Sequence, residues 1–143
     1  MKIQKASLFA LYAVLELASD PERQLSATDI ADKYGISTHH IAKILRTLVR
    51  SKLVQAVRGA GGGYRFTGIM NRTTLLDVIG LFETLESEID APSPNGQVAG
   101  AVVQELQSIT DEIDDLTKAI LDTITLETAL NSSRQRARLS AQE

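Results

Sequence analysis

The sequence has 143 residues, 43% of them hydrophobic, and a formal net charge of −3. This length suits a single domain with a modest core, in which a long element could need a partner's surface to bury its apolar face. Because the sequence contains no cysteine, disulfides, zinc fingers and cysteine-ligated clusters are excluded.

The charge is unevenly distributed along the chain. Residues 1–68 contain ten Lys and Arg against five Asp and Glu, whereas residues 69–143 contain five against thirteen. A basic N-terminal half can face phosphate groups while an acidic C-terminal half faces away from them. Uneven solvated surface charge is the alternative, so the asymmetry does not by itself indicate a nucleic-acid partner.

The sequence gives no sign of a membrane segment. Its longest apolar run, residues 8–15, is much shorter than the roughly 20 residues that a membrane-spanning helix requires. The N-terminus lacks the charged, apolar and small-residue pattern of a secretory leader. We therefore expect a soluble cytoplasmic protein.

Apolar residues at helical spacing predict a helix over residues 3–19, with two apolar stripes that must both be covered. We expect it to lie between the following helices and another long element, from this chain or a second subunit. Ser26 then caps a short helix that Gly35 ends, and Ser37 caps a further helix reaching about Ser51. Two short amphipathic helices joined by a glycine-containing turn are typical of a helix-turn-helix.

A β-hairpin is predicted directly after these helices. Residues 53–58 and 64–67 are rich in β-branched and aromatic side chains, and the glycine tract 59–63 separates them. The tract does not fit a nucleotide site, because Tyr64 stands where a dinucleotide fingerprint needs its third glycine and no Lys-Ser/Thr pair follows. We interpret the hairpin as the wing of a winged helix.

The second half of the sequence predicts two more helices. Thr74 and Asp77 form a capping pattern for an amphipathic helix with apolar positions as far as Leu85. Residues 87–97, which include two prolines and Gly96, form the clearest loop, and residues 98–130 hold a long helix and an end segment. We expect the basic tail, residues 131–143, to be disordered.

The long helix carries an apolar seam with heptad spacing. The pattern lasts only about three heptads, so we interpret it as a helix–helix contact and not as a free-standing coiled coil. The seam could pack on its own domain, but the sequence has no other long helix to lie beside it, which favours a homodimer. The candidate dimer-interface residues are Val102, Leu106, Ile109, Ile113, Leu116 and Ile120.

The second helix of the helix-turn-helix has a buried face and a basic face. If Ile41, Ile44, Leu45 and Leu48 are buried, the opposite face presents His39, Lys43, Arg46 and Arg50. An isolated basic face would be taken as solvated surface, but here it precedes a glycine-tipped hairpin, which favours double-stranded DNA as the partner. The candidate DNA-binding residues are Lys2, Lys5, Ser37, Thr38, His39, Lys43, Arg46, Arg50, Arg58, Gly61, Gly62, Tyr64 and Arg65.

We expect neither a metal, nor another cofactor, nor an enzymatic activity. His39 and His40 are adjacent on a helix, so their side chains point about 100° apart and cannot chelate one ion from the same face. We expect His39 to face DNA and His40 to flank the core. No cysteine is available, and no pair of carboxylates is embedded in an apolar pattern.

The chain resembles the IscR, NsrR and CymR family of bacterial regulators, the Rrf-two family. The resemblance rests on the motifs at residues 1–3, 9–13, 30–31, 35–37, 53–54, 57–64, 74–79 and 124–126. It implies a mainly α fold with a small β-hairpin, in which residues 1–86 form a winged helix-turn-helix and a long C-terminal helix joins a homodimer. It also implies that each winged helix binds half of a partly palindromic operator.

The sequence departs from this family at the positions where relatives bind an iron–sulfur cluster. Cluster-binding relatives carry three cysteines in the loop before the long helix, and residues 88–96 here contain none. Leu8 and Tyr12 occupy the region where other relatives carry an acidic or histidine ligand. What remains resembles the cysteine-free branch of the family, which implies that a small molecule or a partner protein modulates DNA binding. The hypothesis that we favour is a sequence-specific transcription regulator that acts as a repressor. A winged-helix protein-interaction module is the alternative.

Overall fold

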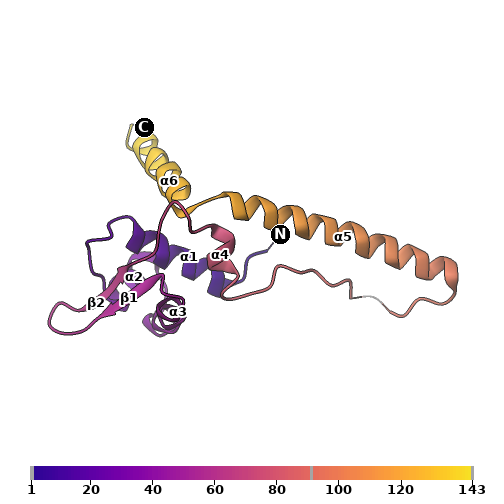
Figure 1. Ribbon diagram of the computed structural model, residues 1–143, viewed down its shortest axis with the longest axis horizontal. Helices are drawn as coiled ribbons and strands as arrows, with labels where there is room; N and C mark the ends of the chain where they lie inside the picture. Colours follow the sequence, from indigo (N-terminus) through magenta and orange to yellow (C-terminus); the bar gives the residue numbers. More distant parts are fainter. Residues whose placement is uncertain (1, 91, 143) are drawn as a thin grey trace.

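The computed structural model describes residues 2–90 and 92–142, and this part of the chain is mainly helical with one two-stranded antiparallel sheet (Figure 1). No helix in it is both long and apolar enough to cross a membrane. In chain order the elements are α1 (Lys5–Ala18), α2 (Ala27–Tyr34), α3 (Thr38–Arg50), β1 (Val54–Val57), β2 (Gly63–Phe66), α4 (Leu75–Ile79), α5 (Gln97–Thr123) and α6 (Leu126–Ala141). The predicted fold class, a winged helix followed by a long C-terminal helix, is confirmed.

Helix α1 lies at the centre of the core. Its first stripe includes Ala10, Val14 and Leu17, which are all fully buried. Helices α2, α3, α4 and α6 and strand β2 all contact it. Of its second stripe, Leu11 is buried, whereas Leu8 and Leu15 are half-buried within the single chain. Helices α4 and α6, which follow later in the chain, pack on α1 together with the helix-turn-helix.

Local capping interactions fix the ends of α2 and α3 as predicted. The Ser26 hydroxyl accepts a hydrogen bond from the Asp29 backbone N–H at 3.0 Å, and the Asp29 carboxylate accepts one from the Ser26 N–H at 3.0 Å. The hydrogen bond from the Ser26 backbone N–H, together with the nearby Ser26 side chain, holds the pKa of Asp29 below its ordinary value. Gly35 ends α2 in the left-handed conformation, with φ of 66°. The Ser37 hydroxyl caps α3 by accepting from the His40 N–H at 3.2 Å.

The hairpin has one face on the core and one face in solvent. Val54 pairs with Phe66, and both side chains are buried. A short segment before α2 extends the sheet, because Leu25 exchanges backbone hydrogen bonds of 2.7 and 3.0 Å with Tyr64. This approach requires Gly63, since a Cβ there would lie 2.5 Å from the Leu25 carbonyl oxygen. The sequence pattern did not indicate this third segment.

Helix α4 is shorter than predicted. Thr74 and Asp77 form the expected capping box, but the helix ends at Ile79 and does not reach Leu85. Gly80 forms the C-cap, and the chain then turns so that Phe82 still packs on the core. Helix propensity is low at glycine, which explains the early end.

The irregular segment after α4 runs outward from the winged-helix body, and helix α5 returns beside it toward the body (Figure 1). Ser87 joins the two, because its N–H and hydroxyl donate to the Asp114 carboxylate at 2.7 and 2.9 Å. Leu121, near the C-terminal end, is the buried residue of α5. The predicted loop over residues 87–97 is irregular where it is described, except at Gln97, which begins α5; residue 91 lies outside the described residues.

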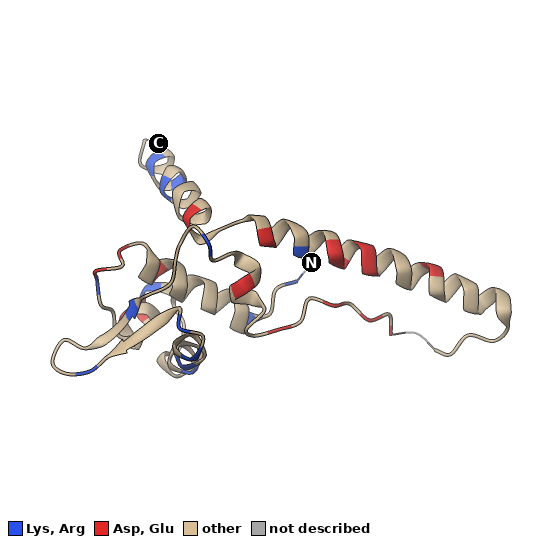
Figure 2. Cartoon of the chain, viewed as in Figure 1, with Lys and Arg blue, Asp and Glu red and all other residues tan. Residues whose placement is uncertain are grey.

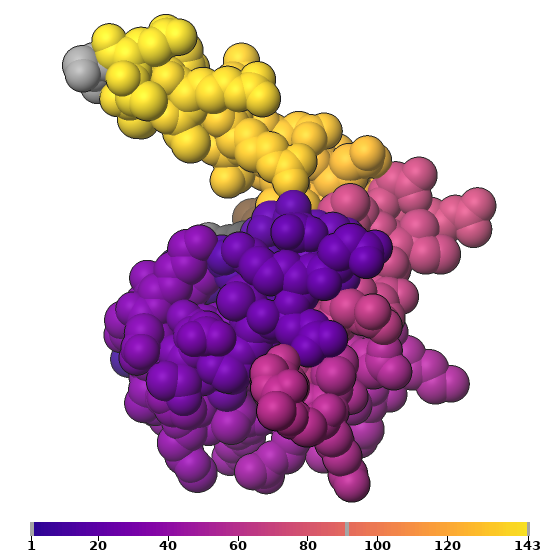
Figure 3. Space-filling view, turned by 90° about the vertical axis from the view of Figure 1, so that its left-hand side faces the viewer, coloured from indigo at the N-terminus to yellow at the C-terminus, as the bar shows by residue number. Residues whose placement is uncertain are grey.

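The prediction that residues 131–143 form a disordered tail is wrong for residues 131–141, which continue helix α6. The helix is anchored at its start by a Thr125 cap and by the buried side chains of Leu126 and Leu130. Arg134 also donates to the Ser19 carbonyl at 3.0 Å. The remaining turns consist largely of good helix formers and stand off the body (Figure 3). Residue 143 lies outside the described residues.

Candidate nucleic-acid interface

Helix α3 separates its apolar and basic faces as predicted. Ile41, Ile44, Leu45 and Leu48 are buried, whereas His39, Lys43, Arg46 and Arg50 are exposed on the other side. Figure 2 shows basic positions on α3 beside the wing, whereas many of the acidic positions lie on α5 and the segment before it. An exposed basic helix next to a hairpin is the arrangement with which winged helices contact DNA.

The first turn of α3 presents small and titratable groups. Thr38 and His39 are exposed there, while the Ser37 hydroxyl is already used by the helix cap. His40 is exposed at the edge of the core, where it lines a cavity that also contacts α1. Thr38 and His39 are thus free to reach an external partner, and Ser37 serves chiefly to orient the helix.

The predicted wing residues divide between two faces of the hairpin. Tyr64 faces α3, where it lines a shallow pocket with Arg46 and Arg50. Arg65 is the next residue on the strand and therefore points to the opposite face, where it donates to the Gln55 side chain at 3.0 Å. Arg58 is exposed in the turn between the strands. The structure therefore brings Tyr64, but not Arg65, beside the basic face of α3.

Two of the predicted glycines lie in this turn and shape it. Gly61 is exposed, with φ of 76°, a conformation that most residues avoid. Gly62 is half-buried and its N–H donates to the Gly59 carbonyl at 2.9 Å. Their contribution to a DNA contact would be close approach of the backbone.

The two N-terminal lysines lie in different surroundings. Lys5 lines the cavity between α1 and α3 together with Lys43, so it joins the basic face. Lys2 instead lies in a hollow with Glu83, Glu86 and Asp114. Acidic neighbours make Lys2 a poorer candidate for a phosphate contact than Lys5.

Comparison with known proteins identifies this arrangement. The model of the Rrf2 family, described as an iron-dependent transcriptional regulator, matches residues 3–132. The chain belongs to the Rrf2 family. Rrf2 proteins are transcription regulators, so the winged helix described above is its DNA-binding region.

Individual relatives agree with this assignment. The chain is 46% identical over 131 residues to BadM of Rhodopseudomonas palustris, a protein assigned as an HTH-type transcriptional regulator; the match covers 91% of this chain and 81% of BadM. The structure of CymR, the global cysteine regulator of B. subtilis, is similar with a TM-score of 0.72 and 26% identity, over 92% of this chain and 98% of CymR. T. potens IscR shares the fold, with a TM-score of 0.66, 23% identity and coverage of 93% and 88%.

The residues of this Rrf2 chain do not fit a thiolate-ligated iron site. The sequence contains no cysteine. Among residues 2–90 and 92–142, no three His, Asp or Glu side chains are placed together to hold a metal ion. The iron dependence in the family description therefore has no matching donor set in the part of the chain that is described.

A buried carboxylate that sequence reasoning missed joins α1 to α2. The Glu16 side chain is only 8% exposed, and it accepts from Lys33 Nζ at 2.7 Å, Tyr34 Oη at 2.7 Å and Arg23 Nη2 at 3.1 Å. Burial raises the pKa of Glu16, but the hydrogen bonds from Lys33 and Tyr34 and the charges of Lys33 and Arg23 outweigh it, so the pKa lies below its ordinary value. Burial and the adjacent carboxylate raise the pKa of Tyr34.

This cluster orients the helix-turn-helix on the core. Its sequence signal was a single acidic residue, Glu16, within the apolar stripes of the first helix. A second buried polar contact lies at the other end of the helix, where the fully buried Ser7 hydroxyl donates to the Glu83 carboxylate. Both contacts join elements distant in sequence, so spacing alone could not pair them.

The predicted seam on α5 is not covered by its own chain. The side chains of its six candidate residues are between 44% and 64% exposed. Few other large apolar side chains among the described residues are this exposed. The seam residues are Val102, Leu106, Ile109, Ile113, Leu116 and Ile120. A row of exposed large apolar side chains is typical of an interaction surface.

Proposed function

We propose that this Rrf2 regulator is a homodimeric repressor that binds a partly palindromic operator and does so without an iron–sulfur cluster. The observation that carries the proposal is the exposed basic face of α3 beside the wing. A regulator of this kind acts on the chromosome, and we accordingly place it in the cytoplasm.

The seam on α5 supports the homodimer. A two-fold axis through paired α5 helices would cover the apolar side chains and present two winged helices. Two recognition helices related by such an axis read half-sites of opposite orientation, which makes the operator partly palindromic. The acidic charge of α5 then faces away from the DNA.

We infer a division of labour among the DNA-binding residues. Thr38, His39 and Lys43, in the first turns of α3, are placed to reach base edges in the major groove. Arg46 and Arg50, nearer the C-terminal end of the helix, and Arg58 in the wing are placed to contact phosphates. Tyr64, on strand β2 of the wing, faces α3 and would help to fix the position of the wing relative to this helix.

The experiment that tests this function is the selection of genomic fragments on the purified protein, followed by sequencing. We expect recovery of a short set of sites with a common, partly palindromic sequence. Lys43→Ala with Arg58→Ala should abolish the selection, whereas Arg72→Ala should not, because Arg72 is an exposed cation outside the candidate face. Unchanged selection by the double variant, with loss of a protein partner, would instead favour a protein-interaction module.

A further inference from the structure

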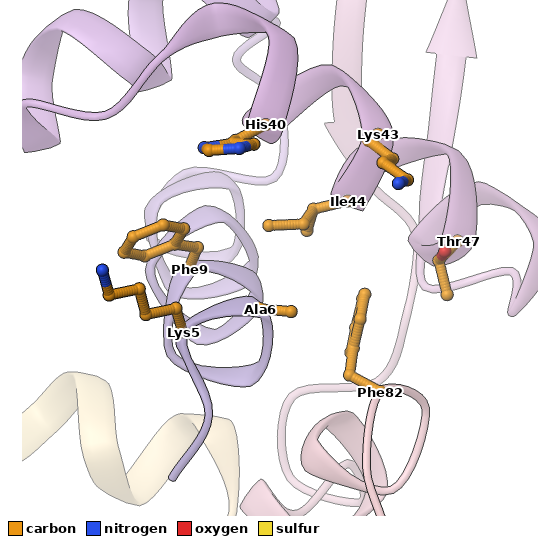
Figure 4. A pocket seen from close by; sticks show the side chains of 8 residues that line it. All are labelled: Lys5, Ala6, Phe9, His40, Lys43, Ile44, Thr47 and Phe82. Atoms are coloured by element: carbon orange, nitrogen blue, oxygen red, sulfur yellow. The ribbon is translucent and has the colours of Figure 1, made fainter.

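A cavity of about 370 Å³ opens between α1 and α3, and Phe82, which follows α4, closes its third side (Figure 4). The volume lies within the range of roughly 300–1,000 Å³ that is typical of small-molecule sites. Phe9 and Phe82 lie on opposite sides of the opening, with Ala6 and Ile44 between them. The interior of the cavity is therefore apolar, and a flat chemical group would fit between the rings of Phe9 and Phe82.

The polar groups around the cavity are basic. Lys5, His40 and Lys43 line it, and no acidic side chain does. The ion pairs found among the described residues join Arg23 and Lys33 to Glu16 and Lys118 to Glu86, so neither cavity lysine is neutralised by a carboxylate. Lys5 and Lys43 lie on opposite sides of the hollow (Figure 4), and cations at the rim of an apolar cavity without an acidic partner are complementary to an anion with an apolar body.

We propose that this cavity binds a small organic anion that combines a flat apolar body with a carboxylate or sulfonate group. The body lies between Phe9 and Phe82, and the anionic group lies at the rim beside Lys43. The regulatory part of this inference rests on the proposed DNA-binding function. Because Lys43 also belongs to the basic face of α3, a ligand that neutralises it adds negative charge where DNA phosphate must approach and so weakens DNA binding.

The binding test uses naphthalene-2-sulfonate as the probe and the two histidines as reporters. The chain contains only His39 and His40, and His40 lines the cavity whereas His39 does not. The ring signals, assigned with a His39→Gln variant, should show a saturable shift of His40 and little change of His39. 2-Naphthol, which lacks the charge, and methanesulfonate, which lacks the rings, should each bind at least about tenfold more weakly.

A cavity-filling substitution separates the cavity from the DNA-binding face. Ala6 is exposed at the cavity and belongs to no proposed DNA contact, so Ala6→Leu should fill the space between the rings and weaken probe binding at least about tenfold. Ala101→Leu, the same change at an exposed position of α5, should leave probe binding unchanged. Circular dichroism and thermal melting check that both variants fold.

The DNA measurement then tests the regulatory step. Saturating naphthalene-2-sulfonate should lower the affinity of the wild-type protein for the selected DNA several-fold and leave that of Ala6→Leu unchanged. Absence of the His40 shift, or equal probe affinity for Ala6→Leu and wild type, would overturn the cavity site. A His40 shift without an effect on DNA affinity would overturn the regulatory step. Failure to bind DNA without the probe would instead refute the proposed function, and the His40 shift would still report on the cavity.

Discussion

Ile113→Asp should convert the proposed dimer into a monomer. Ile113 lies near the middle of the α5 seam and is 57% exposed in the single chain. Complete burial of a Val, Leu or Ile side chain contributes about 1.5–3 kcal/mol, so covering the exposed half contributes about 1 kcal/mol. The seam side chains of both protomers together then give on the order of 12 kcal/mol, against an association cost of about 4–15 kcal/mol.

The free energy gained by covering the seam therefore exceeds the cost of association by only a small margin. In a symmetric dimer the substitution acts twice, because two buried isoleucine contacts are lost and two carboxylates enter a desolvated helix contact. We expect a loss of at least about 4 kcal/mol, which corresponds to a roughly 10³-fold higher dissociation constant. The fold of the protomer should survive, because this side chain is largely uncovered in the single chain.

Sedimentation equilibrium over a range of concentrations measures the effect. Ser108→Asp is the matched control, since Ser108 is exposed on α5 about 120° around the helix from the seam and should tolerate a carboxylate. Circular dichroism and thermal melting should show folded protein for both variants. An Ile113→Asp variant that dimerises as tightly as Ser108→Asp would show that the seam is not the interface.

Three further predictions concern DNA, acid stability and iron. Arg58→Ala should weaken binding to operator and random DNA by the same factor, and the slope of log affinity against log salt should become shallower by about 0.9 per phosphate contact, or about two units in a dimer. Lys43→Ala should instead lower the affinity for the operator by about 1–3 kcal/mol per contact and that for random DNA by less. Equal losses of affinity for both DNAs in both variants would contradict this division of labour. Glu16→Gln should lower the free energy of unfolding at neutral pH by about 1–3 kcal/mol. Because the folded-state pKa of Glu16 lies below its unfolded value, the stabilisation by this carboxylate is present above about pH 4.3 and is lost as the pH falls through the folded-state pKa. The melting temperatures of the wild type and Glu16→Gln between pH 3 and 7 should therefore become equal in acid. A difference that persists in acid would refute the role of the charged Glu16 carboxylate. The purified protein should be colourless, with DNA binding unaffected by chelators or nitric oxide; stoichiometric iron with a visible absorption band would refute the absence of a cluster.

The sequence alone was sufficient for features governed by local interactions. Capping residues such as Ser26, Ser37 and Thr74 lie three positions from their partners, so their spacing predicts where α2, α3 and α4 begin. The buried and basic faces of α3 follow from helical periodicity alone. The seam on α5 could also be predicted, because the heptad spacing of its apolar residues lies within a single helix.

The tertiary structure decided how these elements meet. The buried Glu16 carboxylate is contacted by Lys33 and Tyr34 of α2 and by Arg23 of the segment between α1 and α2, and periodicity does not reveal such pairings. The tail predicted to be disordered is helical, and Arg134 of α6 contacts Ser19, 115 positions away. Arg65 faces away from α3 because the strand register puts Tyr64 on that side. Ends and faces of helices depend on neighbours in sequence, whereas clusters, cavities and shared surfaces depend on the approach of distant segments, which the packing of the whole chain sets.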